Sequence, residues 1–196
     1  MRPYEKCFPK QIYVGLDARS SGRSPTEKHA DVYYDGKTFP FHDSTFDVVL
    51  FTEVLEHCRE PDAVLSEIVR VLSPGGIVLL TVPFIWGEHE SPFDFQRYTL
   101  YGVEEMFTRQ GLRMLEGKRL MPGVDAVQVI VNSEIAAYKH RSRAHQAADG
   151  GWRRRYLEHL ADRLWRVQLR LWRRLYRFER IYLDTFAVAE KPPISQ

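Results

Sequence analysis

The chain has 196 residues, of which 44% are hydrophobic and 13% aromatic, a composition that predicts one globular domain and argues against disorder. Its longest apolar stretch, residues 77–86, is too short for a membrane-spanning helix, and no basic-then-apolar signal peptide is visible. Two cysteines make no disulfide framework, so we expect a reduced, cytoplasmic protein.

The net charge of +2 hides two parts of opposite sign. Residues 141–180 contain twelve Arg and four acidic residues, a net charge of +8, and residues 181–196 carry −1. The remaining 140 residues must therefore carry −5. This division predicts an acidic body with a basic appendage.

Strands alternate with helices over the first 120 residues, a pattern that predicts an α/β fold with a mostly parallel sheet. The apolar run 46–51 has only one polar residue and is expected to be a strand buried on both faces. A helix is expected from Pro61 to the Pro74-Gly75-Gly76 turn. The other expected elements are strands at 11–17, 31–35, 77–82 and 112–120, a loop at 84–98, and a helix at 99–110.

The pattern changes after Gly123 to two long helices, at 124–139 and 152–181, and returns to strand-like alternation at 181–190. We therefore expect an α/β core formed by residues 1–120 and 181–196. Residues 121–180 are expected to form a helical, Arg-rich insertion before the last strand.

Asp17 closes the apolar run 11–17. An acidic residue at the end of the second strand of a nucleotide-binding α/β fold hydrogen-bonds the ribose hydroxyls, and a Gly-rich turn after the first strand holds the rest of the nucleotide. Only ten residues precede this run, and none is Gly. The sequence reads as a nucleotide-binding enzyme that begins one strand late.

Two longer motifs carry a family resemblance. They are DGKTFPFHDSTFDVVLFTEVLEH at residues 35–57 and VLSPGGIVLLTVP at residues 71–83. In this order they resemble a class I S-adenosylmethionine (SAM)-dependent methyltransferase of type 11, over residues 12–120 and the last strand. The resemblance implies a Rossmann-like sheet with an antiparallel last strand, and SAM as the cofactor.

The resemblance also implies a cofactor site. Asp17 corresponds to the acceptor for both ribose hydroxyls, and Asp35 to the acceptor for the adenine amino group, with the backbone of Gly36 and Lys37 beside the ring. Glu53 corresponds to the position where methionine and acceptor meet. The structural alternatives are that Asp17 caps a turn, that Asp35 only forms one, and that Glu53 only complements a helix dipole.

The departure from the family pattern is the missing Gly-x-Gly turn together with the first, central strand. We expect Met1 to be a misplaced start or the chain to be a fragment. The alternative is a truncated, non-catalytic methyltransferase-like protein that acts as an interaction or membrane-docking module. A nicotinamide-dependent dehydrogenase shares the acid after strand two, but the Pro74-Gly75-Gly76 turn argues against it.

The acceptor pocket is expected in the loop after residue 83, which is rich in charged and aromatic residues. His89 is the candidate catalytic base, because its ordinary pKa lies near working pH. The candidate orienting groups on the acceptor side are His57, Glu88, Glu90, Asp94 and Arg97. Alternatively, Asp94 and Arg97 form a structural ion pair and the histidines are packing residues; no ligand spacing stands out, so no metal is predicted.

The segment 152–181 places apolar residues at helical spacing beside ten Arg. A second apolar row is expected to widen this face: Trp165, Leu169, Trp172 and Tyr176. Such a helix fits an anionic membrane surface, or a lid packed on the core. It resembles no RNA- or DNA-binding module, so nucleic acid is not expected. The expected function is methyl transfer to a small-molecule, saccharide or lipid-linked acceptor.

Overall fold

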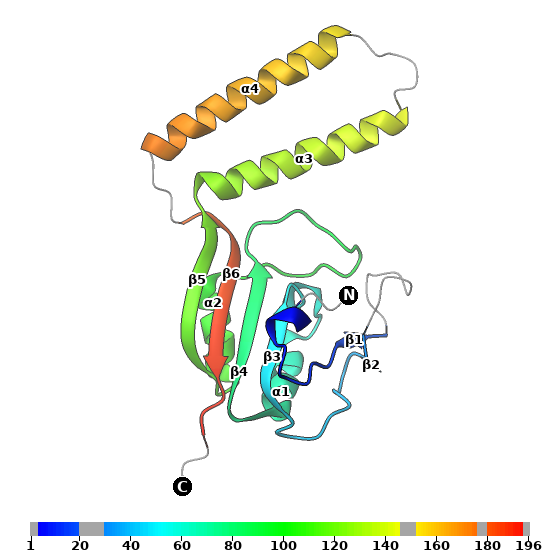
Figure 1. Ribbon diagram of the computed structural model, residues 1–196, viewed down its shortest axis with the longest axis vertical. Helices are drawn as coiled ribbons and strands as arrows, with labels where there is room; N and C mark the ends of the chain where they lie inside the picture. The colour runs from blue at the N-terminus through cyan, green and yellow to red at the C-terminus, as the bar shows by residue number, and fades with distance from the viewer. Residues whose placement is uncertain (1–3, 20–29, 146–151, 176–179, 194–196) are drawn as a thin grey trace. The chain divides into compact units, whose positions relative to one another are not determined.

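The structure is a computed structural model that describes residues 4–19, 30–145, 152–175 and 180–193 (Figure 1). It divides into two compact units. The first, the α/β unit, comprises Met1–Phe84, Glu88–Lys118 and Thr185–Gln196. The second, the helical unit, comprises Ile85–Gly87 and Arg119–Asp184.

The strands form two separate sheets within the described residues. Strands β1 (Leu16–Ala18) and β2 (Val32–Tyr34) pair in parallel. The second sheet has the order β3-β4-β6-β5, with β3 (Phe46–Thr52) parallel to β4 (Leu72–Pro83). Its other two strands are β6 (Tyr182–Glu190) and β5 (Arg113–Pro122).

The last strand, β6, runs antiparallel to β4, as the sequence predicted. Lys191, just after β6, exchanges backbone hydrogen bonds of 2.8 and 2.9 Å with Gly75 and Gly76 at the start of β4. Near the other end, the N–H of Ile85 donates to the carbonyl of Leu183 at 3.1 Å. The predicted α/β class with a mixed sheet is therefore confirmed.

Three strands differ from their predicted form. Strand β1 has only three residues, although the whole run 11–17 was expected to be a strand. It is short because β2, with which it pairs in the described part of the chain, is itself three residues long. β3 was expected to be buried on both faces, but only Phe51 is buried in it, since β3 is an edge strand in the second sheet. The Pro74-Gly75-Gly76 segment lies inside β4 and does not end a helix, because the chain is already extended from Leu72.

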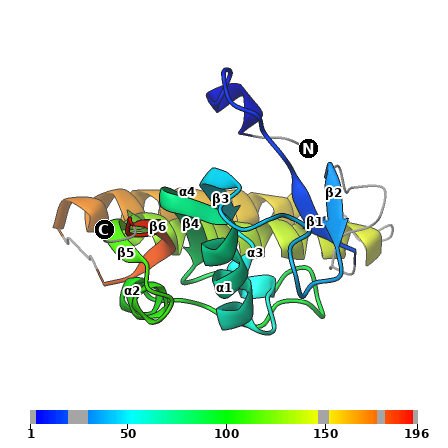
Figure 2. The same ribbon diagram turned by 90° about the horizontal axis from the view of Figure 1, so that it is seen from below.

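Helices α1 (Pro61–Val71) and α2 (Leu100–Arg109) cover the same face of the second sheet (Figure 2). Pro61 occupies the first turn of α1, where its missing N–H costs no hydrogen bond. Thr99 caps α2 by accepting from the N–H of Gly102 at 3.0 Å. Between helices and sheet lies the core, which includes Leu65, Ile68, Val78, Leu80 and Phe107.

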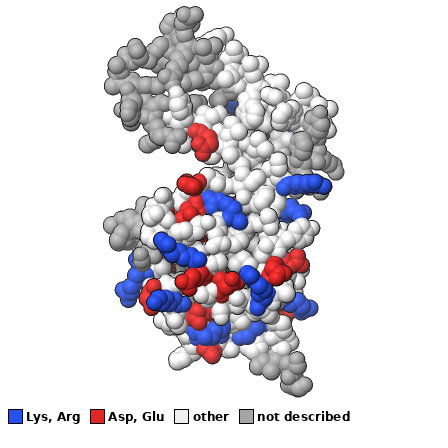
Figure 3. All heavy atoms as spheres, turned by 180° about the vertical axis from the view of Figure 1, so that it is seen from behind, with Lys and Arg blue, Asp and Glu red and all other residues white. Residues whose placement is uncertain are grey.

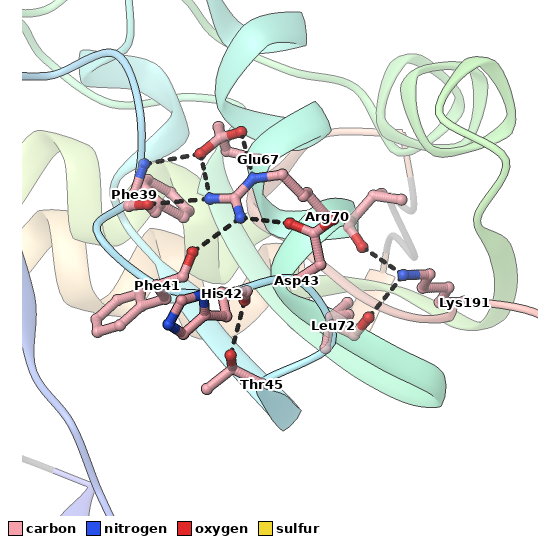
Figure 4. Close-up of polar contacts among 10 residues, drawn as sticks. Phe39, Phe41, His42, Asp43, Thr45, Glu67, Arg70, Leu72 and Lys191 are labelled. Atoms are coloured by element: carbon pink, nitrogen blue, oxygen red, sulfur yellow. Dashed lines mark hydrogen bonds and ion pairs between the residues drawn. The ribbon is translucent and has the colours of Figure 1, made fainter.

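Arg70 near the end of α1 fixes the loop between β2 and β3 (Figure 4). Its guanidinium donates to the carbonyl oxygens of Phe39 and Phe41, at 2.9 and 2.8 Å, and to Asp43 at 2.8 Å. It also forms a two-pronged pair with Glu67, which in turn accepts the N–H of Phe39 at 2.7 Å. One half-exposed Arg thus satisfies several loop groups at once.

The helical unit contains α3 (Val124–His145) and α4 (Trp152–Leu175), which run antiparallel (Figure 1). Leu169 of α4 is buried, and Arg173 on the next turn bonds Gln128 of α3 at 2.8 Å and pairs with Asp125. This side of α4 therefore faces α3. The predicted 176–181 extension of the helix is not part of α4: residues 176–179 lie outside the described residues, and Ile181 is not helical.

The two apolar rows of α4 do not form one wide face, contrary to the sequence expectation. Leu169 of the second row is buried, although Trp172 of the same row is exposed, and five residues of the first row are exposed: Leu160, Leu164, Val167, Leu171 and Leu175. The reason is the helical period: at about 100° per residue, positions 165 and 169 lie on a different side of the helix from positions 164 and 167. No helix within the described residues has the length and apolarity needed to cross a bilayer.

Charges of both signs are interspersed on the face of the α/β unit that Figure 3 shows. Ion pairs join elements distant in sequence, with Arg109 3.0 Å from Asp62 and Arg113 2.5 Å from Glu190.

Candidate active site at the carboxyl ends of the strands

Asp17 and Asp35 lie at the carboxyl ends of the parallel strands β1 and β2. Asp17 is opposite Tyr33 in the ladder and Ala18 is opposite Tyr34, so Asp35 follows directly after the last pair. Burial, followed by the negative charges of Cys58, Asp17 and Asp35, raises the pKa of Tyr34 to about 12. The strand ends, and the chain just before α1, are thus within electrostatic reach of one another.

Asp35 forms the turn that its Asp-Gly sequence suggested. Its Oδ1 atom accepts from the N–H groups of Lys37 and Thr38 at 2.9 and 3.3 Å, and these hydrogen bonds lower its pKa. Gly36 has φ of +86°, and a Cβ atom placed there would meet nothing within 4 Å. The structure leaves open space beside this turn, into which a flat ring could lie against the backbone.

Glu53 follows the last residue of β3 with a left-handed backbone, φ +52°. This conformation is uncommon for a residue with a side chain and costs about 1 kcal/mol or more. The N–H of Glu53 still donates to the carbonyl of Thr81 on β4 at 2.9 Å, so the sheet holds the bend in place. Glu53 is exposed, at the carboxyl end of β3.

Glu56 lies at the centre of the site, in the short 3-10 helix η3 (Leu55–His57), and is completely buried. Neither of its carboxylate oxygens has a hydrogen-bond partner at normal geometry among the described residues. Burial, with a smaller contribution from the charge of Glu53, raises the pKa of Glu56 to about 7. Its own backbone N–H, His89 and Arg97 offset only part of that increase.

His57 and His89 contact each other and Glu56. Their rings meet edge to face with centroids 4.7 Å apart. The Nε2 atoms lie 3.7 Å (His57) and 3.9 Å (His89) from Oε1 of Glu56. The Nδ1 atom of His57 donates to the carbonyl oxygen of Phe93 at 2.5 Å, and Nδ1 of His89 lies 3.3 Å from Oδ2 of Asp94.

Asp94 and Arg97 form the ion pair that the sequence left as an alternative. The guanidinium donates to both carboxylate oxygens, at 2.6 and 2.7 Å, and lowers the pKa of Asp94 to about 2. The backbone N–H of His89 also donates to Asp94, at 2.9 Å. The ion pair therefore also contacts His89.

The structure brings together the candidate base His89 and three of the predicted acceptor-side residues: His57, Asp94 and Arg97. Glu88 is exposed and acts on Arg97 only at a distance, while Glu90 is half-buried with φ of +49°. The sequence analysis missed Glu56. Its signal was a glutamate between the apolar pair Val54-Leu55 and a histidine, but only the fold shows that it is buried between two histidines.

A hollow of about 410 Å³ lies between α3 and α4, lined by residues that include Met121, Gln128, Asn132 and Arg173. It contains none of the predicted site residues. Its lining contains no histidine and one carboxylate, that of Asp125.

Comparison with known proteins gives a consistent family. The family described as "Methyltransferase domain" matches residues 11–80. The phthiotriol/phenolphthiotriol dimycocerosates methyltransferase 1 of Mycobacterium ulcerans is 38% identical over 76 residues, which are 35% of this chain and 28% of that protein. The fatty-acid O-methyltransferase of Mycolicibacterium smegmatis is 34% identical over 82 residues, 39% of this chain and 30% of that protein.

Among solved structures, a chain in the complex between the Haloferax volcanii Trm112 methyltransferase activator and a methyltransferase matches with a TM-score of 0.54. The match has 19% sequence identity and covers 100% of this chain and 78% of that one. At that identity the likeness shows a shared fold. The chain spans only about 30% of the length of the curated relatives it matches.

Proposed function

We propose that the chain is a SAM-dependent methyltransferase, in line with its match to the methyltransferase domain family over residues 11–80, and that it transfers a methyl group from SAM to an acceptor bound beside His89. The observation that supports this proposal is the position of three carboxylates on parallel strands. Asp17 lies in β1 next to its last residue, Asp35 directly follows β2 and Glu53 directly follows β3, and open α/β sheets bind ligands at the carboxyl ends of their strands.

The residues present fit most of a SAM site. Carboxylates are natural acceptors for a ribose diol and an amino group, which are the roles proposed for Asp17 and Asp35. Gly36 leaves open space beside the backbone of Lys37, where we propose that the adenine ring lies, and the role proposed for Glu53 is on the side of the acceptor.

Bound SAM supplies an electrophilic methyl group on a sulfonium. The protein has to align the acceptor, exclude water and, for a hydroxyl acceptor, receive its proton; a carboxylate acceptor has no proton to lose near neutral pH. We propose that His89 would receive the proton of a hydroxyl acceptor on Nε2. Asp94 stabilises the charged imidazole through Nδ1, and Arg97 keeps Asp94 ionised.

We propose a lipid-linked acceptor. One relative acts, by name, on a fatty acid. The exposed leucine and valine row of α4 is flanked on one side by Arg163, Arg166, Arg170 and Arg174. An apolar face with an arginine flank complements an anionic membrane surface, where such an acceptor would be presented.

The proposal is tested by calorimetric titration of S-adenosylhomocysteine into the chain in the presence of EDTA. Micromolar binding, about −8 kcal/mol, supports the cofactor site. Transfer of labelled methyl groups from SAM to fatty acids and hydroxylated lipids then tests the acceptor. A folded chain that binds no S-adenosylhomocysteine would refute the enzymatic proposal and favour a non-catalytic docking module.

A further inference from the structure

We propose that Glu56, His57 and His89 form a binding site for a divalent first-row transition-metal ion, of which zinc is the probe. One ligand atom from each side chain lies within 4.8 Å of the others. The sequence predicted no metal because Glu56 and His57 are adjacent while His89 lies more than thirty residues away, a spacing that matches no common ligand motif. The fold, not the spacing, brings the three together.

The orientation of both imidazoles is the first argument. A carbonyl oxygen can only accept, so the short contact with Phe93 means that Nδ1 of His57 carries the proton. The same holds for His89, whose Nδ1 faces Oδ2 of Asp94, a carboxylate that accepts from the guanidinium of Arg97 through both oxygens. In each neutral ring the lone pair is therefore on Nε2, the atom directed at Glu56.

This arrangement is what metal-binding histidines require. A ligating histidine almost always donates its other ring N–H to a carboxylate or a backbone carbonyl, which fixes the tautomer and the ring orientation. Here one histidine uses a carbonyl and the other a carboxylate, and Arg97 in turn fixes that carboxylate. An outer shell is thus already built around the three side chains.

The carboxylate of Glu56 is the second, independent argument. A buried charged group is normally paired or bound to a metal, because desolvation otherwise costs several kcal/mol. Both oxygens of Glu56 lack a hydrogen-bond partner at normal geometry among the described residues, and two imidazole lone pairs face one of them. A cation between these atoms would satisfy all three groups together.

The dimensions and ligand types suit a transition metal. Zinc bonds to histidine nitrogen and carboxylate oxygen are about 2.0–2.2 Å long, so ligand atoms around one ion lie about 3–3.5 Å apart. The separations of 3.7 and 3.9 Å from Glu56 need to shorten by only a few tenths of an ångström. Two imidazoles and one carboxylate favour zinc, iron or manganese over magnesium, which prefers oxygen ligands alone.

Three protein ligands leave coordination positions open, as in catalytic and not structural sites. His57 and His89 keep 15% and 31% of their side chains exposed, so a small acceptor oxygen could reach the ion. Resting on the proposed methyl transfer, the ion would coordinate that oxygen and favour loss of its proton, with His89 serving as ligand in place of base.

The test uses the full chain after EDTA treatment and buffer exchange, without cofactor or acceptor. We expect one zinc ion per chain at micromolar or tighter affinity by calorimetry, and visible absorption bands when cobalt replaces zinc. Glu56→Gln, His57→Gln and His89→Gln should each weaken binding by about tenfold or more, since even outer-shell partners contribute that much. Asp94→Asn should weaken it less, by perturbing His89.

His42→Gln and His159→Gln are matched controls, because both histidines are exposed and outside the cluster; neither should change zinc affinity. Unchanged zinc binding in the Glu56→Gln and His89→Gln variants overturns the proposal, as does absence of binding by folded wild-type chain. If circular dichroism shows that a cluster variant does not fold, the visible absorption of cobalt bound to the Asp94→Asn variant is measured instead. A spectrum identical to that of the wild-type chain would overturn the proposal. Zinc binding without S-adenosylhomocysteine binding, or the reverse, separates this inference from the proposed function.

Discussion

Oε1 of Glu56 lies 3.7 Å from Nε2 of the neighbouring His57, although the Glu56 side chain is completely buried. Adjacent residues in a regular strand would point to opposite faces, and a regular helix would separate them around its axis. Both residues lie in the 3-10 turn Leu55–His57, which follows the left-handed bend at Glu53, and Nε2 of His89 lies 3.9 Å from the same Glu56 oxygen. Backbone strain at the end of β3 therefore accompanies the assembly of the candidate site.

Glu56→Gln is expected to stabilise the metal-free protein by about 1 kcal/mol, because it removes a buried carboxylate without hydrogen-bond partners and keeps its shape. Urea unfolding at pH 7.5 in EDTA measures the change. The exposed Glu53→Gln variant is the control and should shift the unfolding free energy less. If the Glu56→Gln protein is less stable than wild type, the claim that the Glu56 carboxylate has no stabilising partner is wrong.

Asp17→Asn and Asp35→Asn are each expected to weaken S-adenosylhomocysteine binding by about tenfold, because an amide loses the charged acceptor for a hydroxyl or amino group. Asp47→Asn is the matched control, since Asp47 is exposed near the opposite, amino end of β3. Calorimetric titration gives the affinities. Equal affinities for all three variants would remove Asp17 and Asp35 from the cofactor site.

Arg70→Met is expected to lower the free energy of unfolding by about 2–3 kcal/mol, because it leaves the carbonyls of Phe39 and Phe41 and the carboxylate of Glu67 without their donor. Arg109→Met, which removes a pair with Asp62 that is half-exposed on both sides, should cost less than about 1 kcal/mol. If the two variants lower the free energy of unfolding equally in urea titrations, the hydrogen bonds of Arg70 stabilise the protein no more than a surface ion pair does.

Stability should fall in acid through Glu67, whose pKa is lowered mainly by the hydrogen bond from Arg70. An acid with a lowered folded-state pKa stabilises fully above its unfolded value, about 4.3, and loses that contribution as pH falls through the folded value. Urea unfolding between pH 3 and 7 should therefore show a shallower decline for Glu67→Gln than for wild type. In a protein that already carries Arg70→Met, adding Glu67→Gln should no longer change how the free energy of unfolding depends on pH. If it still does, the acid sensitivity does not come from the pair of Glu67 with Arg70.

Leu164→Glu and Leu171→Glu on the exposed face of α4 should abolish co-sedimentation with vesicles containing anionic phospholipid, because each places a charge in the face that would enter the membrane. Gln168→Glu is the control for added negative charge and should reduce binding only modestly, in a salt-dependent manner. Wild-type chain that remains in the supernatant at low salt would exclude a membrane-docking face.

Sequence alone was enough for the order of elements in the α/β part, because each element carries a local signal. Pro61 and the apolar spacing after it begin α1, Thr99 caps α2, and Gly111 adopts the left-handed backbone that ends it. The family motifs likewise predicted the Rossmann-like class and the antiparallel last strand, since these depend on the order of local patterns. The boundaries of β1 and β4 were wrong because strand length depends on the partner, which lies elsewhere in the chain.

Only the tertiary structure decided which side chains meet. Sequence identified His57, His89, Asp94 and Arg97 as separate candidates, but it gave no sign that Glu56 would be buried between the two histidines. It also could not tell which apolar row of α4 would face α3, because both rows have helical spacing. Periodicity and turn chemistry act within about ten residues, whereas burial and the directions of ring nitrogens are fixed by contacts between segments far apart in the chain.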